Sequence, residues 1–117
     1  MASRREKTKD ARVAEVAEGL CATFEGMDEC MSALLSEMAK TYAWFAVSCD
    51  DLMADLDHEG LLVPGLHGDK ENPKVGVLHK MSARKMEYFA KIQTARNREM
   101  QSAESESDAL MDFVRAR

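Results

Sequence analysis

The sequence predicts an all-α protein, and three of its features support this. It contains nine Met and many Ala, Glu and Lys residues, but only two Pro, which favours helices over strands. No six-residue stretch alternates between apolar and polar side chains in the manner of a strand. Apolar residues instead recur every three or four positions, as they do on one face of a helix.

The longest such stretch is predicted to form a central helix over about residues 28–59. It contains no Gly or Pro, Asp28 can cap its start, and Gly60 stands where a helix commonly ends. Its main apolar seam consists of Met31, Leu35, Met38, Tyr42, Phe45, Cys49, Leu52 and Leu56. A second row consists of Leu34, Trp44, Val47 and Met53. A seam this wide predicts more than one neighbour, and a neighbour in another subunit is one alternative.

Two further helices are predicted to pack with the central one. Residues from about 10 to 25 form an N-terminal helix that ends near Gly26. Residues from about 73 to 97 form a second long helix, because Asn72-Pro73 supplies a cap followed by a suitable first helical residue. Between the long helices, Val63-Pro64-Gly65 is typical of a type II turn within an extended connection.

The ends of the chain are predicted to lie outside this helical domain of residues 10–100. Residues 1–9 form a flexible basic arm. Residues 101–117 form a polar, acidic hinge followed by a short last helix. The apolar side chains of that helix are Leu110, Met111, Phe113 and Val114. This amphipathic tail either docks on a partner or folds back onto its own core.

The net charge of −5 is unevenly distributed along the sequence. Residues 13–69 carry twelve acidic side chains and one basic one, whereas residues 70–98 carry eight basic and two acidic ones. Such segregation indicates either two faces with different partners or an acidic helix that lies against a basic one.

Several classes of protein are disfavoured by the sequence. Three cysteines without a Cys-x-x-Cys motif, a charged N-terminus and the lack of a long apolar run predict a cytoplasmic protein outside the membrane. His58, His67 and His79 lack metal-binding spacing, and residues 65–70 lack the spacing of a phosphate loop. No nucleophile and base occur in a recognisable arrangement. We therefore expect no enzyme, no cofactor and no metal.

Basic residues of the arm and the second long helix are candidates for contacts with DNA phosphates. The selected candidates are Arg4, Arg5, Lys7, Lys9, Lys74, Lys80, Arg84 and Lys85. Lys91, Arg96 and Arg98 extend the basic character of the same helix. The alternative is an ordinary solvated helix face. Because no recognition-helix motif is present, contacts with the nucleic-acid backbone are expected rather than base reading.

From about Asp28 to Ile92, the order of features resembles the small terminase subunits of tailed bacteriophages and prophages. The shared features are Tyr42-Ala43 in a long helix, Glu59-Gly60 before an apolar loop, Gly68, Lys70-Glu71-Asn72-Pro73 at the next helix, and Met86. Two usual segments are absent: a longer N-terminal region with Pro and Trp, and a Gly-Leu-Thr-Pro motif, which residues 93–97 replace.

The resemblance implies a DNA-packaging component without an active site, in the cytoplasm of a bacterial host. Such subunits assemble as rings, bind double-stranded viral DNA and pass it to the large terminase subunit, which carries the ATPase and nuclease. Here it implies a homo-oligomer held by Met31, Leu35, Met38, Tyr42, Phe45, Leu52 and Leu56, with the 110–114 tail docked on the large subunit. The alternative function is a helical protein–protein adaptor, or a small dimeric regulator, that binds no nucleic acid.

Overall fold

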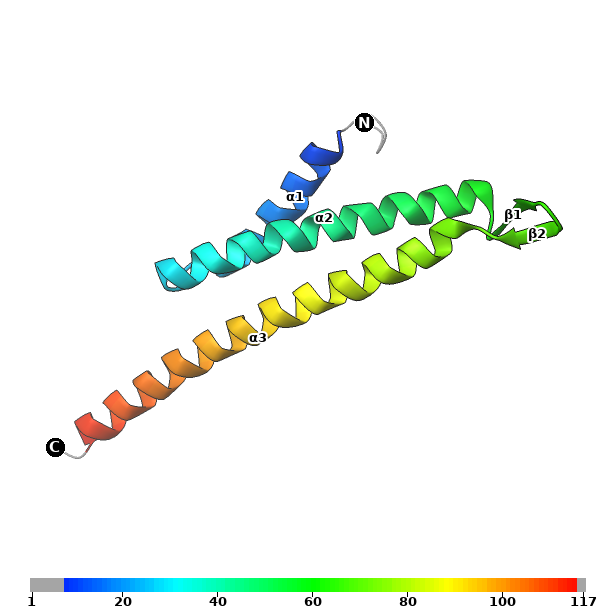
Figure 1. Cartoon of the computed structure of the whole chain (residues 1–117). Coiled ribbons are helices and arrows are strands. Elements are labelled where there is room, and N and C mark those ends of the chain that lie inside the picture. Colours follow the sequence, from blue (N-terminus) through cyan, green and yellow to red (C-terminus); the bar gives the residue numbers. More distant parts are fainter. Residues whose placement is uncertain (1–7, 116–117) are drawn as a thin grey trace.

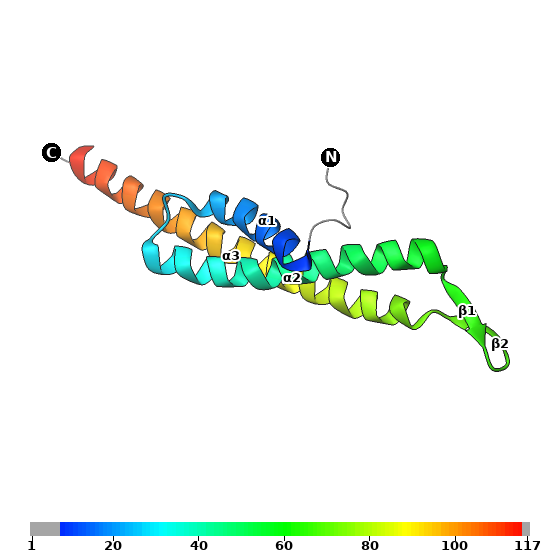
Figure 2. The same cartoon turned by 90° about the horizontal axis from the view of Figure 1, so that it is seen from above.

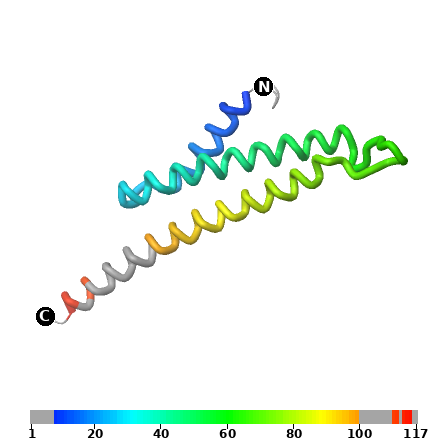
Figure 3. Tube along the Cα trace, in the orientation of Figure 1, coloured from blue at the N-terminus to red at the C-terminus, as the bar shows by residue number. Residues whose placement is uncertain are grey.

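The computed structural model describes residues 8–115, and for residues 100–109 and 112 it describes the backbone alone (Figures 1 and 3). The elements in chain order are α1 (Lys9–Cys21), η1 (Ala22–Phe24), α2 (Glu29–Glu59), β1 (Leu62–Gly65), β2 (Gly68–Glu71) and α3 (Pro73–Arg115). The predicted fold class is confirmed: the chain is mostly helical, and a long central helix packs with an N-terminal helix and a second long helix.

Both ends of α2 and the start of α3 follow local hydrogen-bonding chemistry, as the sequence predicted, whereas α1 ends at Cys21, before the predicted stop near Gly26. The Asp28 side chain accepts a hydrogen bond from the Met31 amide at 3.3 Å, which satisfies a free donor at the start of α2. Gly60 ends α2 with a φ of 88°, a conformation that costs glycine little. Asn72 accepts a hydrogen bond from the Lys74 amide at 3.1 Å and so caps the start of α3.

The central helix α2 lies between the other two helices, with α1 and α3 on different flanks (Figures 1 and 2). The apolar core lies where η1 meets both long helices, and its buried members are Phe24, Leu35, Ala39 and Ile92. The molecule measures 81 × 33 × 21 Å, and its radius of gyration is 20.9 Å. A compact domain of this length would have a radius of about 13 Å, so much of the helical surface is uncovered.

The connection between α2 and α3 is a β-hairpin, and the predicted type II turn is wrong. β1 and β2 pair antiparallel, with Val63 opposite Lys70 and Gly65 opposite Gly68. The turn lies at residues 66–67, and Gly68, not Gly65, has the positive φ, 112°. A Cβ on Gly65 would lie 2.7 Å from the Gly68 carbonyl oxygen. Gly65 is therefore required for the close approach of the two strands rather than for a left-handed turn.

The second long helix does not end near residue 97. α3 runs without interruption to Arg115, so the hinge and the separate last helix expected beyond residue 100 are instead a continuation of α3. No Gly or Pro follows Gly76, and Ala, Gln and Glu are good helix formers. As a result, α3 projects past the start of α2 (Figure 1).

Candidate nucleic-acid interface

One narrow face of α3 packs against α2. The Tyr88 ring stacks on Phe45 with 5.9 Å between centroids, and the Phe89 ring lies 6.0 Å from that of Tyr42. Among the residues of α3 whose side chains are described, Ile92 alone is buried. Most of the surface of α3 is therefore open to solvent.

Four basic side chains form a row on a face of α3 that α2 does not cover. This basic stripe consists of Lys80, Arg84, Lys91 and Arg98, all of which are exposed. At 3.6 residues per turn, their spacing places them within about 40° of one another around the helix. The stripe is about 27 Å long at 1.5 Å per residue, which approaches one turn of B-DNA, about 34 Å.

Few internal contacts neutralise the basic stripe. Arg84 pairs with Glu87 at 3.1 Å, and both side chains are at least half exposed, so this pair contributes little to stability and can exchange for another anion. Lys91 Nζ lies 5.3 Å from the centroid of the Tyr88 ring. No described residue forms an ion pair with Lys80 or Arg98. The stripe thus presents net positive charge, with the Glu87 carboxylate on the same face between Arg84 and Lys91.

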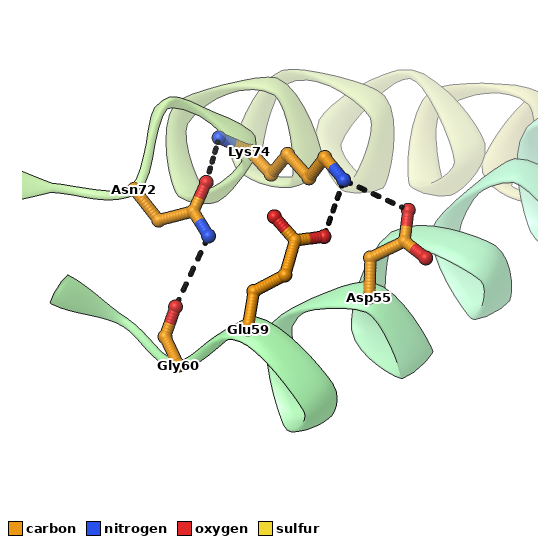
Figure 4. A network of polar contacts seen from close by, with 5 residues as sticks. All are labelled: Asp55, Glu59, Gly60, Asn72 and Lys74. Carbon is orange, nitrogen blue, oxygen red and sulfur yellow. Dashed lines mark hydrogen bonds and ion pairs between the residues drawn. The ribbon is translucent and has the colours of Figure 1, made fainter. Parts of the chain in front are cut away.

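Lys74, another predicted phosphate contact, is used inside the protein (Figure 4). Its ammonium group donates to the carboxylates of Glu59 and, at 3.3 Å, Asp55. These hydrogen bonds, the one to Glu59 foremost, raise the pKa of Lys74 above its ordinary value of 10.5. Beside it, Asn72 Nδ2 donates to the Gly60 carbonyl oxygen at 3.1 Å. These five residues form a polar clasp between the end of α2 and the start of α3.

Two further predicted contacts, Lys85 and Lys9, lie away from the stripe. Lys85 is half-buried and lies about 140° around the helix from Lys80, on the side of α2. Lys9 Nζ lies 4.1 Å from the centroid of the Trp44 ring. The other three candidates, Arg4, Arg5 and Lys7, lie outside the described residues.

The basic stripe therefore contains two of the predicted contacts, Lys80 and Arg84, and two bases that the prediction left out, Lys91 and Arg98. Helical spacing alone could have selected them, because offsets of 11 and 18 residues from Lys80 correspond to about three and five whole turns. The pairing of Lys74 had no comparable signal in the sequence, since it depends on how α2 and α3 are aligned.

The predicted oligomerisation residues lie largely within the contacts of one chain. Leu35 is 0% and Leu56 is 8% exposed. The other five, Met31, Met38, Tyr42, Phe45 and Leu52, are half-buried. More exposed apolar side chains on the long helices are Leu34, Trp44, Met53, Met86 and Phe89, at 40–59%. This second set offers another subunit more apolar area than the seam does.

The predicted docking tail lies in the part of α3 that projects past α2. The Asp28 amide donates to Glu99 Oε1 at 3.4 Å, which places the start of α2 beside residue 99 of α3. The tail residues Leu110, Met111, Phe113 and Val114 are 50–64% exposed. Their apolar surface does not return to the core of the chain.

Among the residues whose side chains the structure describes, no group of three His, Cys, Asp or Glu residues is placed to hold a metal ion. No helix of the described chain has the length and apolar character needed to cross a membrane. Comparison with models of protein families, with curated proteins and with solved structures gave no match to this chain.

Proposed function

We propose that this chain is a non-catalytic small terminase subunit, which binds viral DNA and delivers it to the large terminase subunit for genome packaging in the bacterial cytoplasm. The observation that carries the proposal is the basic stripe on α3. Exposed bases in a row can contact the phosphates of a duplex, and the sequence contains no recognition-helix motif that would direct these side chains to base edges. The stripe predicts sequence-independent contact with the DNA backbone.

The shape of the molecule supports the second part of the proposal, self-association. The molecule is extended, with a radius of gyration of 20.9 Å, and Ile92 alone is buried among the α3 side chains that the structure describes. Apolar side chains such as Met53 and Met86 are therefore half exposed. Exposed apolar surface of this kind is typical of chains that associate. A homo-oligomer, with a ring as its most symmetric form, would cover these side chains and bring several basic stripes together.

The tail supplies the proposed contact with the large subunit. Leu110, Met111, Phe113 and Val114 are exposed at the free end of α3. A helix that presents an apolar face beyond the body of its own chain can enter a groove on another protein. The tail and the stripe are far enough apart along α3 to engage different partners at the same time.

The DNA-binding part of the proposal is tested by a matched pair of double variants. The stripe variant, Lys91→Gln/Arg98→Gln, neutralises two bases of the stripe. The control variant, Lys40→Gln/Lys70→Gln, neutralises two exposed bases outside the stripe. Affinity for a random-sequence duplex is measured by fluorescence anisotropy at several salt concentrations. Each lost phosphate contact should lower the slope of log affinity against log salt by about 0.9, so the stripe variant should lose about 2 in slope.

The control variant should keep the slope of the wild type. Equal slopes for all three proteins would remove the stripe as the DNA interface. Absolute mass from light scattering on a sizing column, with and without DNA, tests assembly in the same samples. The proposal expects a closed assembly whose mass increases with DNA, and a compact monomer indifferent to DNA would contradict it.

A helical adaptor is the second candidate, and the charge pairs within the chain favour it. Lys74 bridges Asp55 and Glu59, and Arg12 pairs with Asp51 at 2.6 Å. Part of the charge segregation in the sequence is thus satisfied between the chain's own helices. An assembly that binds no DNA at low salt would favour the adaptor.

A further inference from the structure

A groove of about 250 Å³ opens beside Trp44, between α2, the first turns of α3 and the first residue of α1. Its lining consists of Lys9, Trp44, Ser48, Asp51, Leu52, Asp55, Val77 and Met81. We call this the Trp44 groove. It is bounded by one aromatic ring, two carboxylates and an apolar wall from α3.

The α2 side of the Trp44 groove already binds cations from elsewhere in the chain. Lys9 Nζ lies 4.1 Å from the Trp44 centroid, and Arg12 pairs with Asp51 at 2.6 Å. An aromatic face beside carboxylates is the usual environment for guanidinium and ammonium groups. Room remains for a further cation, because the Trp44 residue is 42% exposed and the Asp55 side chain is 51% exposed.

Ser48 gives a second indication that the groove takes an occupant. The residue is 6% exposed, and its Oγ has no hydrogen-bond partner among the described residues. A buried hydroxyl without a partner is uncommon in native proteins. A polar group that enters the groove, with a small rotation of the Ser48 side chain, would satisfy it.

We propose that residues 1–7 of the same chain dock in the Trp44 groove. Lys9 lines the groove, and the last residue of this segment, Lys7, is two residues before it in the sequence. Seven extended residues span at most about 23 Å, so the segment can reach the groove. The segment carries Arg4, Arg5 and Lys7 against one acid, Glu6. Residues 8–60, which supply the whole lining except Val77 and Met81 of α3, carry twelve acidic and three basic side chains. The charges of segment and surroundings are therefore complementary.

The docking has a consequence that rests on the proposed function. Arg4, Arg5 and Lys7 cannot contact the groove and a DNA phosphate at the same time. The acidic α2 surface and the duplex then compete for the same segment, so DNA releases it from the groove. While it is docked, the segment would limit DNA binding at low DNA concentration. Once released, it would add contacts with DNA phosphates.

The docking can be tested without DNA, because Trp44 is the single tryptophan of the chain. Acrylamide quenching of its fluorescence is compared between the wild type and the triple variant Arg4→Ser/Arg5→Ser/Lys7→Ser, which we call the arm variant. Removal of the docked segment uncovers the indole ring, so the quenching constant should rise about twofold. Salt at about 0.5 M shortens the Debye length to a few Å. It should therefore raise the quenching constant of the wild type to that of the variant and leave the quenching constant of the variant unchanged.

The charge-matched control is Lys40→Ser/Lys70→Ser/Arg98→Ser, which removes three bases that do not line the groove. It should quench as the wild type does. The free heptapeptide of residues 1–7, added to the arm variant, should restore protection of Trp44, whereas the same peptide with its three bases replaced by Ser should not. Circular dichroism verifies that every variant keeps its helix content.

Equal quenching in the wild type and the arm variant, or no effect of the basic heptapeptide, would overturn the docking proposal. Neither result bears on DNA binding, since no DNA is present. The slope of log DNA affinity against log salt concentration in the stripe variant is measured separately, and its value does not bear on the groove. The two proposals can therefore fail independently.

Discussion

The two ends of the α2–α3 pair are held together by different kinds of contact. At the end near η1, three elements meet around Phe24, Leu35 and Ile92, which are 0–2% exposed. At the end near the β-hairpin, α2 and α3 are joined by the hydrogen bonds and ion pairs of the polar clasp (Figure 4). One end is an apolar core and the other is a set of directional polar bonds.

Because of this difference, one end contributes most of the stability and the other determines how α2 and α3 are aligned. Burial of large apolar side chains contributes most of the free energy of folding, so the η1 end should dominate the stability of the whole chain. Hydrogen bonds contribute less individually but require specific partners at specific distances. The polar clasp therefore fixes which residues of α2 and α3 lie side by side, and it should open without unfolding the other end.

Truncation in the apolar core should have the largest effect. Phe24→Ala leaves a cavity where η1 meets both long helices and should lower the free energy of unfolding by about 3–5 kcal/mol. Urea titration followed by circular dichroism measures this loss. Phe89→Ala, at a residue that is 40% exposed, is the control and should cost less than half as much. Equal losses would mean that η1 does not form the principal core.

A change in the polar clasp should have an intermediate and more local effect. Asn72→Ala removes both the cap of α3 and the donor to the Gly60 carbonyl oxygen, and should cost about 2 kcal/mol. Hydrogen exchange should accelerate in residues 56–76 and remain slow around Leu35. Asn97→Ala, at an exposed position of α3, should change neither region. Faster exchange throughout the chain would contradict the separation of the two ends.

Local chemistry is the part of this fold that the sequence could reveal. Asp28, Gly60 and Asn72 act where they stand in the sequence, because a cap bonds to amides two or three residues away. Their positions correctly marked both ends of α2 and the start of α3. The apolar spacing of α2 likewise requires no knowledge of the neighbouring helices.

The β-hairpin and the length of α3 could not be obtained in this way. The strands are four residues each, and every residue of β2 (Gly68–Glu71) is exposed, so no alternation between buried and exposed side chains marks β2. The hairpin depends on the approach of Gly65 to Gly68 and on the closure by Asn72, both of which involve other elements. The polar residues after Met100 suggested a break, but without Gly or Pro nothing in the backbone ends the helix.

The residues of the candidate site, like the elements of the fold, could be predicted from the sequence only in part. Position around a helix follows from residue number, so the members of the basic stripe could be identified from the sequence. Which bases are already paired follows from how α2 aligns with α3, as the pairing of Lys74 with Asp55 and Glu59 illustrates. Charge counts along a sequence therefore overestimate the bases that are available to a nucleic acid.

Removal of the Lys74 charge should have the smallest effect and a defined dependence on pH. Because the folded-state pKa of Lys74 is raised above 10.5, its stabilisation is fully present below pH 10.5 and is lost as the pH rises through the folded value. Lys74→Gln should thus lower the urea midpoint slightly at neutral pH. The difference from the wild type should vanish well above pH 10.5. Lys80→Gln, at a base without an ion pair among the described residues, should match the wild type throughout. A Lys74→Gln difference that persists in strong alkali would show that its side-chain stem, rather than its charge, closes the clasp.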